Sequence, residues 1–157
     1  MLRRTMLLVT ASILAAIGGA QAQESAATKA IEAAKQFSGS EITVVAEAGL
    51  QALLDKTITG PEWEKLTGIK VNVVEANFEE IYPKTILEKQ AGTGAFDVVL
   101  ISPAWLADFV ANDAVVPLDP YIEKYGVKSE FDDINPAFKD WMTYNGKIYG
   151  LVVDGDV

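Results

Sequence analysis

Two carboxylates near the end of the sequence, Asp154 and Asp156, have the spacing for joint chemistry. On an extended chain, residues two apart project from the same face. Such a pair can hold a metal ion for sugar-nucleotide chemistry, but a calcium site uses about six to eight oxygen ligands, and the sequence has no D-x-D-x-D-G loop. Paired carboxylates also hydrolyse glycosidic bonds when they stand roughly 5 to 9.5 Å apart across the substrate. Neither chemistry has a second supporting motif in the sequence.

The sequence contains no cysteine and no histidine. Thiol nucleophiles, Ser-His-Asp triads and zinc sites made of imidazole or thiolate groups are therefore excluded within these 157 residues. No disulfide can stabilise the chain, so its stability must come from a hydrophobic core. After removal of a 22-residue leader, 135 residues remain, which is enough for one domain. We expect no metal and no cofactor.

The elements that position polar residues are clearest between Ile69 and Ile101, which read strand, helix, strand. Two β-branched runs separated by a helical pattern predict a crossover unit of a parallel sheet. Ligands bind such sheets at the carboxyl ends of the strands. The first of these ends carries Glu75, Ala76 and Asn77, and the second carries Ser102, Pro103 and Ala104. The sequence therefore predicts that the site lies at this edge.

The remaining elements follow from periodicity and from turn and cap residues. Residues 24–37 permit a short surface helix, and a strand follows at 42–46. Three helical details are predicted: a break at Gly60-Pro61, a left-handed cap at Gly68, and a kink or restart at Pro83. The strand at 69–73 has one partly polar face, so we expect it nearer a sheet edge than the apolar strand at 96–101, which should be covered on both faces.

A further helix is led by Asn77 with Glu80 as its capping partner, and Phe78, Ile81, Tyr82 and Thr85 fall on one of its faces. Two more helices have N-terminal signals: Ser102 as N-cap before Pro103, and Asn135-Pro136 at the start of a helix through Met142. The remaining predicted elements are an extended piece at 115–118, a helix at 119–125, a turn at Asn145-Gly146 and a strand at 147–153.

The first 22 residues have the order of a secretory signal: Arg3 and Arg4, an apolar run from Met6 to Ile17, and Ala20-Gln21-Ala22 as a cleavage site. The alternative is a membrane anchor, but a span needs about 20 apolar residues. Cleavage would change the formal net charge from −9 to −11. An acidic chain disfavours nucleic acid and anionic membranes as partners.

Four motifs in this order resemble the family 1 extracellular solute-binding proteins, the type II periplasmic receptors that deliver sugars to ABC importers. The motifs are Glu64–Val71, Ala91–Val99, Val116–Ile122 and Tyr144–Leu151. The resemblance implies a two-lobed α/β protein, with a largely parallel sheet flanked by helices in its first lobe. It implies that residues 41–157 form lobe one up to the hinge, after a leader segment at 23–40, with the second lobe absent. It also places Asp154 and Asp156 in the hinge region, facing the cleft.

The resemblance also suggests ligand contacts. In maltose-type receptors the first glutamate of an E-E-x-aromatic-Pro stretch bonds sugar hydroxyls, which points to Glu79 here; the alternative is that Glu79 only favours the positive end of a helix. Glu47 follows the first strand, where related receptors place polar contacts, but a solvated loop glutamate would look the same. Maltose-type proteins carry polar side chains where this chain has Pro103 and Ala104, which disfavours a maltodextrin.

Three tryptophans have different expected roles. Trp105 lies after the third strand, where its ring can stack on a pyranose or pack into the core. Trp63 and Trp141 are assigned to packing.

We therefore expect a monomeric periplasmic binding component of an ABC transporter. It would capture a sugar or related small polar solute, work with the membrane subunits of the importer, and perform no catalysis. The alternative is an exported carbohydrate-active enzyme that uses paired carboxylates. The final Asp154-Gly155-Asp156 run, followed by no further element, predicts a sequence cut inside a larger protein.

Overall fold

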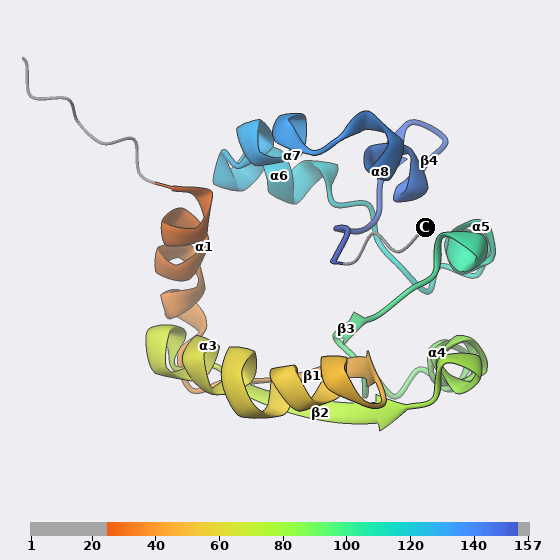
Figure 1. Cartoon of the computed structure of the whole chain (residues 1–157), viewed down its shortest axis with the longest axis horizontal. Helices are drawn as coiled ribbons and strands as arrows, with labels where there is room; N and C mark the ends of the chain where they lie inside the picture. The colour runs from red at the N-terminus through yellow and green to blue at the C-terminus, as the bar shows by residue number, and fades with distance from the viewer. Residues whose placement is uncertain (1–24, 154–157) are drawn as a thin grey trace, which may run out of the picture.

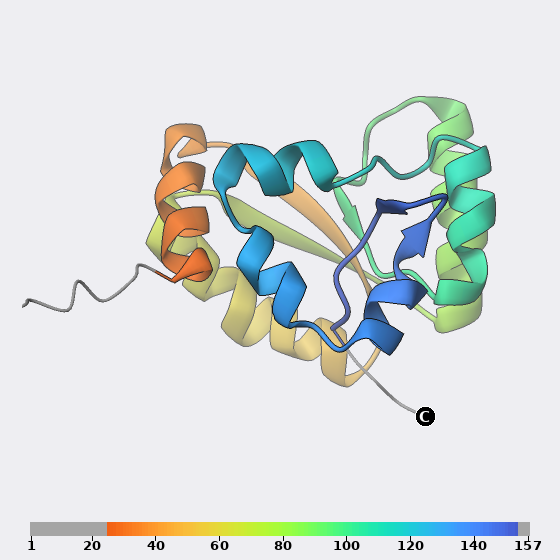
Figure 2. The same cartoon turned by 90° about the horizontal axis from the view of Figure 1, so that it is seen from above.

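The computed structural model describes residues 25–153. The predicted leader at residues 1–22 lies outside the described residues, and so do Asp154 and Asp156. The described chain contains a three-stranded sheet flanked by helices, and a small hairpin that follows three further helices (Figures 1 and 2). The elements are α1 (Ala26–Ala34), η1 (Lys35–Phe37), β1 (Glu41–Glu47), α2 (Leu50–Leu54), η2 (Asp55–Thr59), α3 (Gly60–Thr67), β2 (Lys70–Ala76), α4 (Phe78–Ala91), β3 (Val98–Val99), η3 (Pro103–Trp105), α5 (Leu106–Ala111), α6 (Asp119–Tyr125), α7 (Lys128–Asp133), α8 (Pro136–Trp141), β4 (Thr143–Tyr144) and β5 (Lys147–Ile148).

The sheet is parallel, as predicted, with strand order β2-β1-β3. β1 pairs with β2 along its whole length, from Glu41 opposite Lys70 to Glu47 opposite Ala76. On its other side, β1 pairs with β3 through Val44 and Val45. Because all three strands run in one direction, their carboxyl ends meet at one edge of the sheet, next to the start of α4 (Figure 1).

The third strand is shorter and more exposed than its apolar sequence predicts. Only Val98 and Val99 form strand, and half of Val98 is exposed. Backbone bonds from Asp97 N–H to Thr43 O and from Leu100 N–H to Val45 O extend the pairing slightly. In residues 25–153 β3 is hydrogen-bonded to a strand on one side only. The helices α2 and α3 pack on β1 and β2. β3 is therefore an edge strand like β2, so the prediction that β2 lies nearer an edge than this strand is wrong for this part of the chain. The 50% exposure of Val98 contradicts the prediction of a strand covered on both faces.

The predicted break at Gly60-Pro61 is a wide helical turn instead. α2, the π-helical turn η2 and α3 follow one another without interruption, and Gly60 N–H donates to Asp55 O five residues earlier. The extra residue in this turn accommodates Pro61, which has no N–H to donate. A Cβ on Gly60 would lie 2.5 Å from Asp55 O and 3.3 Å from Val71 Cβ, so only glycine lets the helix approach β2 this closely. α3 then ends at Gly68 in the predicted left-handed conformation, with φ 77°.

α4 begins at the predicted position and continues through Pro83. Asn77 is the N-cap residue, although its side chain accepts no capping bond, and the helix runs unbroken from Phe78 to Ala91. The predicted restart at Pro83 is therefore wrong. Ile81 and Thr85 on its inner face are buried, and the core cluster of Val45, Ala76 and Ile81 joins α4 to one face of the sheet. Packing of this apolar face stabilises the helix across the missing Pro83 hydrogen bond.

The segment after β3 follows the predicted caps and turns. Ser102 and Asn135 each accept a capping bond at a helix start, from Ala104 N–H and Ala137 N–H. Asn145 and Gly146 have φ of 49° and 74°, the left-handed pair that closes a two-residue hairpin between β4 and β5. The strand predicted at 147–153 is present only at Lys147–Ile148. Beyond Ile148 the chain has no strand to pair with in the described residues, although Tyr149 N–H still donates to Met142 O.

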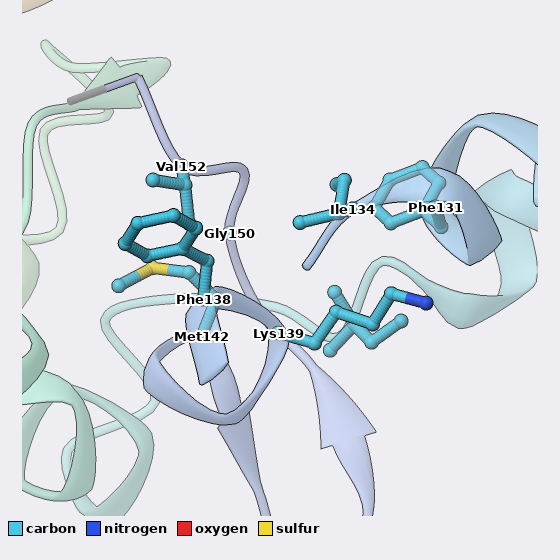
Figure 3. A pocket seen from close by; sticks show the side chains of 8 residues that line it. Phe131, Ile134, Phe138, Lys139, Met142, Gly150 and Val152 are labelled. Carbon is cyan, nitrogen blue, oxygen red and sulfur yellow. The ribbon is translucent and has the colours of Figure 1, made fainter. Parts of the chain in front are cut away.

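The hairpin and the last helices enclose a narrow apolar hollow. Phe138, Met142 and Val152 lie close together on one side of it, and Phe131 and Ile134 lie on the other (Figure 3). A Cβ on Gly150 would lie 2.8 Å from Met142 Sδ. The tight contact at Gly150 makes this hollow part of the packing between α7, α8 and the chain after β5. At the other end of the chain α1 packs against α3 and α6 and so connects the sheet layer to these helices (Figure 1).

Candidate functional site

Two of the predicted site residues lie at the carboxyl edge of the sheet, one at a strand end and one in the helix that follows the neighbouring strand. Glu47 is the last residue of β1 and pairs in register with Ala76, the last residue of β2. Ala48 N–H donates to Ala76 O at 2.9 Å and holds the two strand ends together. α4 starts two residues after Ala76, so Glu79 lies in its first turn. The parallel register therefore brings Glu47 and the Glu79 turn to the same edge of the sheet.

The side chains of Glu47 and Glu79 are exposed and have no ion pair or hydrogen bond within residues 25–153. The neighbouring glutamates differ, because Glu75 pairs with Lys56 and Glu80 pairs with Lys84 at 2.9 Å. The hydrogen bond and charge of Lys84 hold the pKa of Glu80 below its usual range. The negative charge of Glu79 is stabilised by the positive N-terminal end of α4. Both carboxylates without partners are thus free to accept hydrogen bonds from a ligand.

Trp105 lies at the same edge, inside an aromatic cluster. It ends η3, the short helix that begins after the Ser102 cap. Its ring lies 4.6 Å from the Phe78 ring, 5.9 Å from Tyr82 and 6.3 Å from Phe109, measured between ring centres. It is half-buried and packs against the core cluster of Val45, Ala76 and Ile81. The packing role considered for Trp105 is therefore present, and its contact with a ligand stays a prediction.

Tyr82 and Asp108 link α4 to α5 beside this cluster. The Tyr82 hydroxyl donates to Asp108 Oδ2 at 3.3 Å, and the Tyr82 ring stacks on Phe109 at 5.4 Å. Burial, together with the charge of Asp108, raises the pKa of Tyr82. These contacts fix the position of α5, and with it the position of Trp105.

Trp63 and Trp141 pack as predicted. Trp63 on α3 borders a hollow between the helix and the sheet, lined also by Ile42, Val44 and Val71. Its buried Nε1 has no hydrogen-bond partner among the described residues. Trp141 packs edge-on against Phe138 at 5.0 Å.

The sequence placed Phe78 only on the packing face of α4, with Ile81, Tyr82 and Thr85. In the structure its ring packs on Trp105, yet the residue is 40% exposed, unlike the buried Ile81 one turn later. Phe78 is the first helical residue after β2, and the first turn of a helix projects beyond the strand end that precedes it. This position in the sequence is the signal that could have identified Phe78 as a site residue. Phe78 therefore joins Glu47, Glu79 and Trp105 at the candidate site.

Among residues 25–153, no group of three or more acidic, histidine or cysteine side chains is arranged to hold a metal ion. The same residues include no helix that is both long and apolar enough to cross a membrane.

Comparison with known families gives one match, over residues 61–156, to the model described as bacterial extracellular solute-binding protein. No curated protein matches the sequence.

Several solved structures are similar to this chain. An ABC transporter solute-binding protein from Agrobacterium radiobacter K84, in complex with ribitol, is 22% identical with a TM-score of 0.63, over 71% of this chain and 28% of that one. The Thermus thermophilus maltotriose-binding protein, bound with maltotriose, is 27% identical with a TM-score of 0.62, over 70% and 28%. An ABC substrate-binding protein from Listeria monocytogenes, in complex with cycloalternan, is 28% identical with a TM-score of 0.58, over 71% and 28%.

These matches confirm the predicted fold class, a partial lobe of a maltose-binding-like periplasmic binding protein. The chain spans about 28% of the length of these three structures.

Proposed function

Because the chain belongs to the family of bacterial extracellular solute-binding proteins, we propose that it is the first lobe of a two-lobed receptor that captures a sugar or sugar alcohol for an ABC importer. The observation that carries this proposal is the pair of exposed, unpaired carboxylates at one edge of the sheet, Glu47 at the end of β1 and Glu79 in the first turn of α4 after the adjacent strand β2. The similar structures bound to ribitol, maltotriose and cycloalternan support polyols and sugars as the ligand class.

The chemistry of the edge fits such ligands. A carboxylate accepts from two hydroxyls at once through charge-assisted hydrogen bonds, which are about twice as strong as neutral ones. Aromatic rings beside it offer apolar surface to the C–H faces of a sugar. Closure of a second lobe over the edge excludes water and strengthens these bonds. In this proposal, residues 41–157 form lobe one after a leader segment at 23–40, and Asp154 and Asp156 lie at the hinge.

The proposal includes export to the periplasm as a monomer and delivery of the ligand to the membrane subunits of the importer. Cleavage after Ala22 would leave Gln23 as the first residue. We expect mass spectrometry of the exported protein to give the mass of a chain that begins at Gln23. A purified periplasmic protein that retains Met1 would contradict cleavage.

Calorimetry on the full-length protein that contains this chain tests the function directly. We expect saturable heat of binding with at least one of ribitol, glucose, maltose and maltotriose, and unchanged ligand recovered afterwards. The family consists of binding proteins, so release of reducing ends from a glycoside is not expected. Such release would favour the carbohydrate-active enzyme, and absence of binding to every sugar and polyol would contradict the receptor.

A further inference from the structure

We propose that Phe78 is the aromatic platform of the site and that its ligand is a pyranose sugar rather than an open-chain sugar alcohol. This inference rests on the proposed function and deepens it. Phe78 is the first residue of α4, directly before Glu79 and two residues after the end of β2. As a residue Phe78 is 40% exposed, while Ile81 and Thr85 on the same helix are buried.

Trp105 is less suited to this role, because other side chains already surround it. Phe78 lies against its ring at 4.6 Å, Tyr82 and Phe109 lie at 5.9 and 6.3 Å, and the core cluster packs beneath it. Phe78, in contrast, packs on Trp105 and is still 40% exposed as a residue. We therefore assign to Phe78 the stacking role that the sequence predicts for Trp105.

The support makes Phe78 a rigid surface. A phenylalanine side chain has only two rotatable bonds, and packing on Trp105 with ring planes 35° apart restricts them further. A ligand that stacks on a ring held in this way loses little additional side-chain entropy on binding. An exposed aromatic group that is already ordered is thus a better binding surface than a freely rotating one.

The pairing of Phe78 with Glu79 selects the ligand class. A pyranose has a flat face of C–H groups, which suits the negatively charged face of an aromatic ring, and equatorial hydroxyls at its rim, which suit a carboxylate. An open-chain polyol has the hydroxyls but no rigid apolar face. Adjacent residues that offer both kinds of contact therefore favour the ring-shaped sugar.

An exposed aromatic side chain can also have no function, since isolated apolar groups are common on protein surfaces. Phe37 provides a matched control for this possibility. It is 53% exposed and lies in η1, before the amino end of β1, whereas Phe78 follows the carboxyl end of β2. Phe37 and Phe78 are thus the same residue type, similarly exposed, near opposite edges of the sheet.

The test is calorimetry on the full-length protein and its Phe78→Ala, Phe78→Tyr, Phe78→Leu and Phe37→Ala variants, with glucose, maltose and ribitol as probes. We expect the unaltered protein to bind glucose or maltose more tightly than ribitol. Phe78→Ala should weaken the pyranose by about 10-fold or more, as loss of an aromatic anchor does. Phe78→Leu should weaken it nearly as much, because leucine keeps apolar volume but has no flat ring. Phe78→Tyr keeps the flat ring and should recover most of the affinity that Phe78→Ala loses, and Phe37→Ala should bind as before.

The outcomes separate this inference from the function on which it rests. Binding of ribitol without a pyranose, or equal pyranose affinity in Phe78→Ala and the unaltered protein, overturns the platform and leaves the receptor standing. Equal loss in Phe78→Ala and Phe37→Ala also overturns it, because the effect would then not depend on the edge of the sheet. Failure of the unaltered protein to bind any probe overturns the receptor together with the platform.

Discussion

Replacing Ile81 with alanine is expected to lower the free energy of unfolding by about 2 to 5 kcal/mol, the usual cost of truncating a fully buried aliphatic side chain. Ile81 has no exposed surface and joins α4 to Val45 and Ala76 of the sheet. The truncation leaves a cavity between the helix and the strands, because the surrounding backbone can collapse only in part. Urea denaturation followed by circular dichroism measures the change.

The Ile81→Ala substitution should also affect the candidate site. The first turn of α4 carries Phe78 and Glu79, and Ile81 anchors the helix one turn later. A looser helix positions those two side chains less well, so ligand affinity should fall along with stability. Ile81→Val, which removes a single methylene, should cost only about 0.5 to 1.5 kcal/mol.

Leu87 on the same helix provides the control. It is 62% exposed, so Leu87→Ala should change stability by only about 0.5 kcal/mol or less, as surface substitutions do. Equal losses in the Leu87 and Ile81 variants would show that α4 does not pack on the sheet through Ile81. The assigned core would then be wrong.

The Glu79→Gln variant is expected to bind its sugar about 10 to 100 times more weakly than the unaltered full-length protein, as removal of a charged hydrogen-bond acceptor implies. Glutamine keeps the size of the side chain and one acceptor oxygen, but it removes the charge and replaces the second acceptor oxygen with an NH2 donor. The probe is the sugar in the calorimetric panel that the unaltered protein binds most tightly. Calorimetry gives the ratio of the two dissociation constants.

Glu80→Gln is the matched control, one residue further along the same helix. Glu80 is engaged by Lys84 on the surface of α4. Its replacement should lower stability only slightly, because exposed helical ion pairs contribute little, and it should leave the dissociation constant unchanged. A Glu80 variant that loses affinity while Glu79→Gln binds normally would reverse the assignment of the two glutamates.

Local patterns in the sequence predicted most elements of the fold. The strands at β1 and β2, the caps at Ser102 and Asn135, the left-handed Gly68 and the Asn145-Gly146 turn all appear where expected. Each depends on the conformational preferences of a few neighbouring residues, which do not change with distant contacts. The family resemblance stated from four motifs is confirmed by the match over residues 61–156.

Errors arose where a residue's state depends on distant neighbours. The apolar run at 96–101 predicted a strand covered on both faces, but Val98 is 50% exposed, because the cover of a strand depends on which distant elements pack on it. Pro83 predicted a kink or a restart of the helix, but the helix does not restart, because packing of Ile81 and Thr85 keeps α4 continuous. Likewise, the π-helical turn before Pro61 depends on the close approach of Gly60 to Val71.

The same distinction between local and distant contacts applies to the candidate site. The sequence by itself determined that acidic and aromatic residues follow the strands of a parallel sheet, because alternation and cap residues are local properties. Only the tertiary structure decided that β1 lies between β2 and β3, that Glu80 is paired while Glu47 and Glu79 are not, and that Phe78 rests exposed on Trp105. Strand order, ion pairing and exposure depend on which distant residues come into contact, and residue spacing along the chain does not specify those contacts.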